Sequence, residues 1–395
     1  MSELKGACII GQSGGPTSVI NASAYGVIRT ALDSDCITAV YGAEHGIKGV
    51  LADRLFDMSK EDARELELLK YTPSSALGSC RYKIADPDVD DTDYKRILEV
   101  FKKHDVRYFF YNGGNDSMDT CNKVNELAKK EGLDLRVIGI PKTMDNDLDI
   151  TDHCPGFGSA ARYAAQSACE LALDASALPI HVVVLELMGR NAGWVTAASA
   201  LAARLTDCEV LTYLPERPVD EEKMLADIER CYAKGKGLLV TVSEGICGLD
   251  GKPFADTGLV DGFGHTIPGG TAQHISDQII QKLGLKSRAE KPGLLGRASI
   301  PYVSLPDREE AYAVGKYAVE AALRGESGSM VAIEAQRSPA YHSSLFLAPL
   351  SQVANVEKKF PLEWIEGDNR IADAFFDYAM PLMGGGFPQY ALLRK

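Results

Sequence analysis

Residues 109–121, FFYNGGNDSMDTC, change from a strand pattern to a helix pattern within a few positions. The aromatic run at the start is typical of a buried strand, and Met118, Cys121 and Val124 then follow at the spacing of one helix face. Two glycines stand between the two patterns, so the backbone N–H groups of this turn would be open to a phosphate. Asp116 nevertheless places a negative charge in the same turn, which a simple anion site would not be expected to carry.

Strand-like and helix-like segments alternate along the rest of the chain. We expect strands at 7–10, 37–42, 106–112, 136–140, 181–187, 237–245 and 329–335. We expect helices at 19–32, 93–105, 191–205, 271–284 and 307–325, the last opening with Asp307 and Glu310 as an acidic variant of the capping box. This alternation predicts α/β domains in which helices cover both faces of parallel sheets.

The bulk composition is that of an ordinary globular enzyme. The chain has 395 residues, enough for two or three domains or two interlocked ones, and carries 55 acidic against 42 basic residues for a net charge of −13. No basic stripe or long apolar stretch is present, so we expect neither a nucleic-acid nor a membrane partner. Nine scattered cysteines without a CxxC pair favour a reducing, cytoplasmic location, and the N-terminus is expected to be a first strand rather than a signal peptide.

Polar clusters follow five of the expected strands. They occupy 12–17, 113–117, 142–147, 188–191 and 243–245. Ligands of open α/β sheets bind at the carboxyl ends of the strands. One such cluster could be an ordinary turn, but five with the same polarity indicate a binding site.

The clusters contain the side chains that phosphate chemistry needs. Gly14 and Gly15 would let the backbone approach a phosphate, although the segment matches neither the Walker nor the dinucleotide pattern. In 142–147, Lys142 could neutralise a phosphate, and Asp145 or Asp147 could act as a general base; the alternatives are a solvated loop or a glycosidase carboxylate pair, which would not need a glycine-rich cradle.

Further along the chain, several charged residues could bind a phosphorylated sugar. Arg81 could hold phosphate or lie on the surface, Arg190 is set at a strand end before a helix, and Glu244 at a strand tip could accept sugar hydroxyl groups. Arg288 and Arg297 stand nine positions apart, a spacing that means little alone.

Together these motifs carry a resemblance to a known family. The glycine pair at 14–15, GGNDS, PKTMDND, MGRNAG and SEG occur in the order found in phosphofructokinases, from about residue 6 to residue 335. The chain most resembles the pyrophosphate-dependent members. This implies two Rossmann-like α/β domains with the active site between them: a phosphoryl-donor domain of 1–150 plus about 265–305, and a sugar-phosphate domain of 151–264 plus about 306–395.

The resemblance also implies an activity and its residues. The enzyme would reversibly transfer a phosphoryl group from magnesium pyrophosphate to the C1 hydroxyl of fructose 6-phosphate, with Asp145 as base and Thr143 orienting the acceptor. The residues implied for pyrophosphate are Gly14, Arg81, Gly114, Asp116 and Lys142. Those implied for the sugar phosphate, besides Thr143 and Asp145, are Met188, Gly189, Arg190, Glu244, Arg288 and Arg297.

ATP-using relatives typically carry glycine where this chain has Asp116 and often where it has Lys142. Asp116 would therefore lie where the α-phosphate of ATP would go. Two like charges ~4 Å apart at an effective dielectric of ~20 repel by about 4 kcal/mol, roughly a thousandfold discrimination. Lys142 would instead stabilise the charge on the leaving phosphate.

Two departures from the family pattern bear on the site. Asn115 stands where relatives carry an acidic partner of Mg²⁺, and would bind the ion through its carbonyl oxygen or a water. His181 stands where many relatives place an arginine that crosses the subunit boundary of a homodimer or homotetramer. The resemblance therefore implies that this contact is either missing or shared with Arg288 and Arg297. An ATP-dependent sugar kinase of the same fold and a non-catalytic phosphosugar sensor stay open as alternatives.

Overall fold

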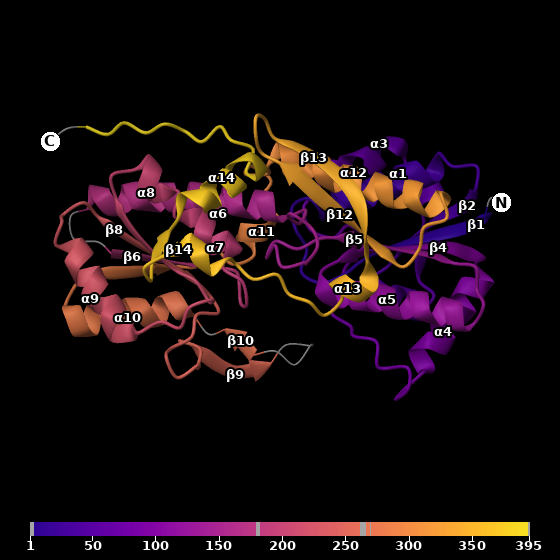
Figure 1. Cartoon of the computed structure of the whole chain (residues 1–395), viewed down its shortest axis with the longest axis horizontal. Coiled ribbons are helices and arrows are strands. Elements are labelled where there is room, and N and C mark those ends of the chain that lie inside the picture. Colours follow the sequence, from indigo (N-terminus) through magenta and orange to yellow (C-terminus); the bar gives the residue numbers. More distant parts are fainter. Residues whose placement is uncertain (1–3, 179–181, 261–265, 269, 394–395) are drawn as a thin grey trace. The chain divides into compact units, whose positions relative to one another are not determined.

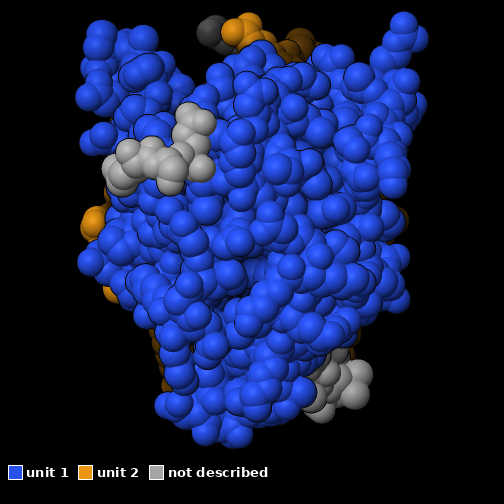
Figure 2. Space-filling view, turned by 90° about the vertical axis from the view of Figure 1, so that its right-hand side faces the viewer, with its two compact units in different colours: residues 1–156, 305–357 blue, residues 157–304, 358–395 orange. Residues whose placement is uncertain are grey.

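The computed structural model describes residues 4–178, 182–260, 266–268 and 270–393. Contacts divide the chain into two compact units. The first comprises residues 1–156 and 305–357, and the second 157–304 and 358–395. Figure 2 shows the surface of the first unit, which combines two segments that residues 157–304 separate in sequence.

These units differ from the expected domain ranges in two places. Residues 265–305 were expected with the first domain, but strand β11 (Ser287–Glu290) pairs with β6 (Val182–Leu187) of the second unit. Residues 306–357 were expected with the second domain, but helix α12 (Leu305–Leu323) packs on α1 (Ile20–Leu32) of the first. Pairing and packing across long sequence separations determine such boundaries, and local patterns do not reveal them.

A seven-stranded sheet forms the centre of the first unit (Figure 1). Its order is β13-β12-β5-β4-β1-β2-β3; β13 and β3 run antiparallel to their neighbours and the other pairs are parallel. The strands are β1 (Gly6–Gln12), β2 (Ile37–Ala43), β3 (Leu55–Asp57), β4 (Val106–Gly113), β5 (Arg136–Pro141), β12 (Ser329–Gln336) and β13 (His342–Pro349). The remaining helices are α2 (Ile47–Leu51), α3 (Ala63–Leu68), α4 (Thr92–Lys103), α5 (Asn115–Lys130) and α13 (Leu350–Val353).

Helices cover both faces of this sheet, as the alternating pattern predicts. On one face, α1 and α12 pack on inward side chains such as Cys8, Ile10 and Phe110. On the other, α4 and α5 pack on side chains such as Ile9 and Phe109. Strand β1 is buried along its whole length, which explains why it reads as an uninterrupted apolar run rather than an alternating one.

The second unit is built on a four-stranded parallel sheet of order β11-β6-β8-β7. Helices α9 and α10 cover one face through an apolar cluster, and α6 contacts β6 and β8 from the opposite face (Figure 1). The elements not yet given are α6 (Phe157–Ala177), α7 (Trp194–Ser199), α8 (Ala202–Leu205), β7 (Glu209–Tyr213), α9 (Glu221–Tyr232), β8 (Leu238–Ser243), β9 (Asp256–Val260), β10 (Thr266–Pro268), α10 (Thr271–Leu283), α11 (Leu295–Ala298), β14 (Ile365–Glu366), β15 (Arg370–Ile371), α14 (Asp373–Leu382) and three short 3-10 helices, η1 (Met58–Lys60), η2 (Leu69–Tyr71) and η3 (Leu362–Trp364).

Two helix predictions are corrected by the structure. The single helix expected at 191–205 is two short helices, α7 and α8, because the N–H groups of Ala200 and Leu201 bond three residues back in a tighter turn. Helix α12 begins at Leu305, so Asp307 and Glu310 do not form a capping box. Their carboxylates instead bind residues 153 and 156 of a neighbouring loop.

No helix in the described part of the chain has both the length and the apolar character needed to cross a membrane.

Candidate active site

The polar clusters lie together within each unit, as expected from their positions at strand ends. In the first unit, β1, β4 and β5 are adjacent parallel strands that end at Gln12, Gly113 and Pro141. Clusters 12–17, 113–117 and 142–147 therefore share one edge of the sheet. In the second unit, β6 and β8 are adjacent and parallel, which brings 188–191 beside 243–245.

Lys142 joins two of the first unit's clusters. Its side chain is buried, and its Nζ donates a hydrogen bond to the carbonyl oxygen of Gly15 at 2.6 Å. Its backbone N–H donates to Gly113 O at 3.0 Å. Gly14 has φ +75°, a left-handed conformation that glycine adopts without strain, and a Cβ there would stand 3.4 Å from Lys142 Nζ. The lysine charge is thus held against the first glycine turn.

The turn at 113–117 opens helix α5. A Cβ on Gly113 would lie 2.0 Å from Ser117 Oγ, so only glycine fits there. Gly114 is the N-cap, and Asp116 stands in the first helical turn, where the helix dipole favours a negative charge. The Asp116 side chain is 41% exposed, and its nearest ion-pair partner is Lys83, with Nζ 3.9 Å from Oδ1. Asp116 is therefore a partly solvated group with Lys83 as its neighbour.

Arg81 follows a segment that is tied to the first glycine turn. The N–H of Gly14 donates to Cys80 O at 3.0 Å, and Ser79 Oγ donates to Gly14 O at 2.6 Å. The Arg81 side chain itself is exposed. Its backbone therefore lies next to the first glycine turn.

The loop at 142–147, which we call the acceptor loop, is held in shape by its own side chains. The N–H of Asp145 donates to Thr143 Oγ1 at 3.1 Å. Asn146 adopts φ +55° and its Oδ1 accepts from the N–H of Cys154 at 2.9 Å. Asp145 is half-buried, whereas Thr143 and Asn146 are buried.

Asp147 has the more unusual environment of the two candidate carboxylates. Burial raises its pKa, Glu357 raises it further, and Thr143 and Lys142 partly offset the rise. Its Oδ1 is buried and, among the described residues, has no hydrogen-bond partner. A carboxylate oxygen in this state has a free lone pair for a ligand or a cation.

Asn115, the expected magnesium ligand, is already engaged at both ends of its amide. Its Oδ1 accepts from the N–H of Asn355 at 2.5 Å, and its Nδ2 donates to Val356 O. Residues 355 and 356 thus contact Asn115, and the next residue, Glu357, lies near Asp147. Sequence reasoning named Asp147 only as a second candidate base, and the buried oxygen could not have been inferred from its spacing.

In the second unit, Glu244 lies against the turn that carries Arg190. A Cβ on Gly245 would fall 1.9 Å from Arg190 O, so the two turns touch through their backbones. The N–H of Glu244 donates to Leu187 O at 3.0 Å. Burial raises the pKa of Glu244, while Lys291, a backbone bond from Gly189 and Arg190 hold it down.

Lys291 and Glu186 belong to the same cluster and were missed by the sequence analysis. Lys291 Nζ lies 2.5 Å from Glu186 Oε1, whose side chain is 1% exposed. The other carboxylate oxygen accepts the N–H of Ala272 at 2.9 Å, at the start of α10. Both residues lie near strand ends, but a single Glu in an apolar strand and a single Lys before Pro292 gave no pattern to recognise.

The remaining candidates are less closely gathered. Met188 and Arg190 are half-buried, and Gly189 is buried with φ +141°. Arg288 is exposed and pairs in register with Val183, four positions before the end of β6. Arg297 is half-buried on the short helix α11. His181 lies outside the described residues.

Comparison with known proteins places these features in a family. The phosphofructokinase family model matches residues 7–322. A Methylococcus capsulatus protein named pyrophosphate–fructose 6-phosphate 1-phosphotransferase is 45% identical over 387 residues, covering 96% of this chain and 92% of that protein. A sulfofructose kinase of Alkalicoccus urumqiensis is 36% identical, covering 91% and 94%.

A solved structure gives the same likeness. The pyrophosphate-dependent phosphofructokinase of Nitrosospira multiformis superposes with a TM-score of 0.87 at 41% identity, covering 98% of this chain and 94% of that one.

Proposed function

Because this chain belongs to the phosphofructokinase family, we propose that it transfers a phosphoryl group reversibly from pyrophosphate to the C1 hydroxyl of fructose 6-phosphate. The products are fructose 1,6-bisphosphate and orthophosphate. Relatives that cover nearly the whole chain carry this activity in their names, which supports the proposal. The chain is accordingly a phosphotransferase of sugar metabolism.

The buried Lys142 is the residue that favours pyrophosphate as the phosphoryl donor. Its ammonium group is held 2.6 Å from the carbonyl oxygen of Gly15, beside the two glycine turns at the same sheet edge. A fixed cation at this edge suits a compact, highly charged donor such as pyrophosphate. The backbone of Gly14, whose own N–H bonds Cys80 O, borders this edge without a Cβ, Gly114 offers its backbone N–H, and Arg81 supplies a second cation.

Asp116 excludes a nucleotide at the same edge. Its carboxylate repels a third phosphate and fills space that glycine would leave open. The exposed fraction of its side chain and the pairing with Lys83 weaken this repulsion, so the discrimination falls below the thousandfold of the unscreened estimate.

Asp145 acts as the general base. It takes the proton from the C1 hydroxyl as that oxygen bonds to the near phosphorus, while the bridging P–O bond breaks and its electron pair leaves with orthophosphate. Thr143 holds the loop that aims this carboxylate, since its Oγ1 accepts the N–H of Asp145. The transfer depends on alignment and charge neutralisation more than on covalent chemistry by the protein.

Enzymes of this family generally need Mg²⁺, and the acceptor-loop residues fit that ion. The buried Oδ1 of Asp147, which has no hydrogen-bond partner in the described part of the chain, is a ligand of the type Mg²⁺ prefers. Asn115, whose carbonyl oxygen already accepts Asn355, would reach the ion through a water. When bound, the ion would neutralise phosphate oxygens of pyrophosphate.

The second unit binds the sugar phosphate. Glu244 accepts sugar hydroxyls, with Met188 and Gly189 beside it, and Arg190, Arg288 and Arg297 pair with the 6-phosphate. The exposed, mid-strand position of Arg288 supports a role at a boundary between subunits, and the homo-oligomer implied by the resemblance stays a prediction.

A sugar carrying a sulfonate at C6 is a second candidate acceptor, favoured by the sulfofructose kinase among the relatives. The two acceptors differ in charge, because a phosphate monoester carries about two negative charges at neutral pH and a sulfonate carries one. Three arginines in the proposed set favour the phosphate.

The experiment is a ³¹P NMR assay of purified protein with Mg²⁺, pyrophosphate and either fructose 6-phosphate or its 6-sulfo analogue. We expect the pyrophosphate signal to be replaced by orthophosphate and fructose 1,6-bisphosphate, and the reverse conversion from those products. Faster turnover of the sulfonate would reassign the acceptor, and no turnover of either sugar would refute the proposed function.

A further inference from the structure

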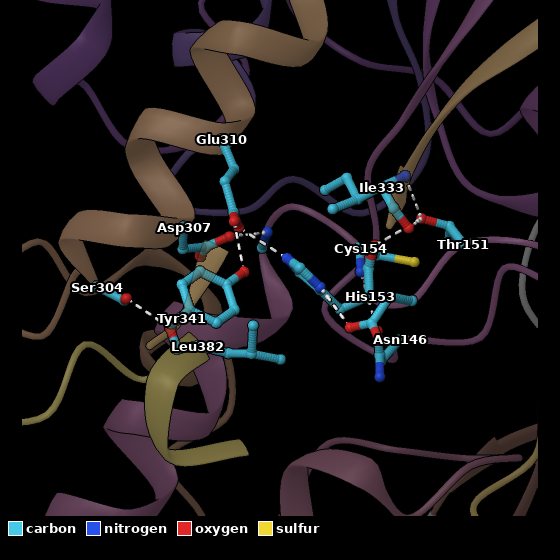
Figure 3. Close-up of polar contacts among 12 residues, drawn as sticks. Asn146, Thr151, His153, Cys154, Ser304, Asp307, Glu310, Ile333, Tyr341 and Leu382 are labelled. Carbon is cyan, nitrogen blue, oxygen red and sulfur yellow. Dashed lines mark hydrogen bonds and ion pairs between the residues drawn. The ribbon is translucent and has the colours of Figure 1, made fainter. Parts of the chain in front are cut away.

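A buried ion cluster lies behind the acceptor loop and has no part in the mechanism given above. The cluster consists of Asp152, His153, Glu310, Arg337 and Tyr341. Figure 3 shows His153, Glu310 and Tyr341 of this cluster. It joins the segment at 151–156, which we call the return segment, to helix α12 and to the end of strand β12. All of these residues belong to the first unit.

His153 is the centre of this cluster. The residue is 2% exposed, its Nδ1 lies 2.9 Å from Asp152 Oδ1, and its Nε2 lies 2.7 Å from Glu310 Oε2. A carboxylate only accepts hydrogen bonds, so both ring nitrogens must donate. Both nitrogens carry protons only in the imidazolium form, and a neutral ring would lose one of the two bonds.

The carboxylates around the ring are themselves held in place. Arg337 donates to both oxygens of Asp152, at 2.9 Å and 2.6 Å. Tyr341 donates its hydroxyl proton to Glu310, and Ser343 bonds the same carboxylate. Asp152, Glu310, Arg337 and Tyr341 are thus the titratable groups that face the ring, from the return segment, α12 and the β12–β13 connection.

The return segment in turn holds the acceptor loop. The N–H of Cys154, the residue after His153, donates to Asn146 Oδ1 at 2.9 Å, and Asn146 lies between Asp145 and Asp147. The N–H of Thr143 donates to Pro155 O at 3.3 Å. The N–H of Gly156 donates to Asp307 Oδ1 of α12 at 2.8 Å. Both ends of the acceptor loop are therefore hydrogen-bonded to the segment that His153 anchors.

We propose that His153 is a positioning residue for phosphoryl transfer, which as an imidazolium anchors the return segment and so aims Asp145 at the acceptor hydroxyl. It touches no reacting atom; it acts through Cys154 and Asn146. Loss of either ring bond would let the return segment shift, and a displacement of about 1 Å at the reacting groups costs on the order of 100-fold in rate.

The protonation state follows from the balance of burial and partners. Burial alone would lower the pKa of His153, but the bonds and charges of Asp152 and Glu310 raise it above the ordinary value. The same contacts overcome burial to lower the pKa of Glu310. Stabilisation by the imidazolium is therefore complete below the ordinary histidine pKa and is lost as the pH rises through the raised one.

The matched test compares His153→Gln with His104→Gln. His104 also bonds a carboxylate, with Nε2 2.6 Å from Asp53 Oδ1, but it follows α4, away from the acceptor loop. We expect His153→Gln to lower kcat by 10- to 100-fold with KM for pyrophosphate within threefold, and His104→Gln to change both by less than twofold. We also expect kcat of the wild-type enzyme to fall at alkaline pH as the imidazolium loses its proton, and this fall to disappear in His153→Gln.

Two further measurements keep the proposal testable if His153→Gln does not fold. Tyr341→Phe removes one bond from Glu310 and leaves the ring intact, so a smaller fall in kcat is expected. In ¹⁵N-histidine NMR of the wild-type protein, His153 should carry protons on both ring nitrogens at pH 7, since both face carboxylate oxygens. A neutral His153 ring at pH 7, or unchanged kcat in a folded His153→Gln, would overturn the proposal.

This inference rests on the proposed function, and the two can fail separately. Absence of turnover in the wild-type protein would contradict the function, whereas the NMR result does not depend on activity. Normal wild-type turnover together with an unaffected His153→Gln enzyme would contradict the positioning role alone.

Discussion

The acceptor loop at 142–147 and the turn at 113–117 lie at the same sheet edge but are built differently. The loop is fixed by buried bonds: Lys142 is 3% exposed, and Asn146, fully buried, bonds the return segment. In the turn, Asp116 is 41% exposed and its ion pair with Lys83 spans 3.9 Å. The proposed phosphoryl transfer thus depends on a loop held by buried bonds, whereas the proposed donor preference depends on a solvated charge. The donor preference should therefore be easier to change by mutation than the catalytic step.

The largest expected effect is on the rigid loop. Asp145→Ser removes the proposed base, so kcat should fall by about 10³-fold with KM changed little, since a positioned base contributes typically 10²- to 10⁴-fold. Steady-state kinetics with pyrophosphate and fructose 6-phosphate measures this.

Asp149→Ser is the matched control for the base. Asp149 is half-buried and lies two residues beyond Asp147, outside the acceptor loop, so kcat should change by less than twofold. A mild effect of Asp145→Ser would transfer the role of base to Asp147.

A smaller effect is expected when the donor residues are exchanged. The double change Asp116→Gly and Lys142→Gly restores the residues that ATP-using relatives typically carry. We expect kcat/KM for pyrophosphate to fall by about 100-fold and that for ATP to rise by about tenfold, because one fixed cation and one repelling anion are lost.

The control for this exchange is Asp134→Gly. Asp134 is an exposed carboxylate paired with Arg136 at the start of β5, so its loss should leave the ratio of the two donors unchanged. If the double variant gains no ATP turnover, Asp116 is not the residue that excludes ATP from the donor site.

The smallest effect is expected in the second unit, where Glu244 binds rather than transforms the sugar. Burial raises the pKa of Glu244, so its ionised form is lost at a higher pH than for an ordinary glutamate, and KM for fructose 6-phosphate should rise as the pH falls. Glu244→Gln should raise KM by about tenfold and remove this pH dependence. If KM for fructose 6-phosphate still rises at low pH in the variant, the group that titrates is not Glu244.

The sequence predicted the sheet-and-helix architecture because apolar runs and their periodicity are local signals. The adjacency of 12–17, 113–117 and 142–147 followed from the rule that parallel strands end at one edge. The capping role of Asp307 and Glu310 was wrong, because their partners, residues 153 and 156, are about 150 positions away. Lys291 with Glu186, and the buried Asp147 oxygen, were missed for the same reason: tertiary contact determines them, and no spacing along the chain reports it.

The central claim, that Asp116 and Lys142 select pyrophosphate, is tested most directly by measuring kcat/KM of the wild-type protein for pyrophosphate and for ATP at saturating fructose 6-phosphate and Mg²⁺. We predict a preference for pyrophosphate of at least about 100-fold, allowing for screening of the exposed Asp116 charge. Equal or faster turnover with ATP would contradict the claim.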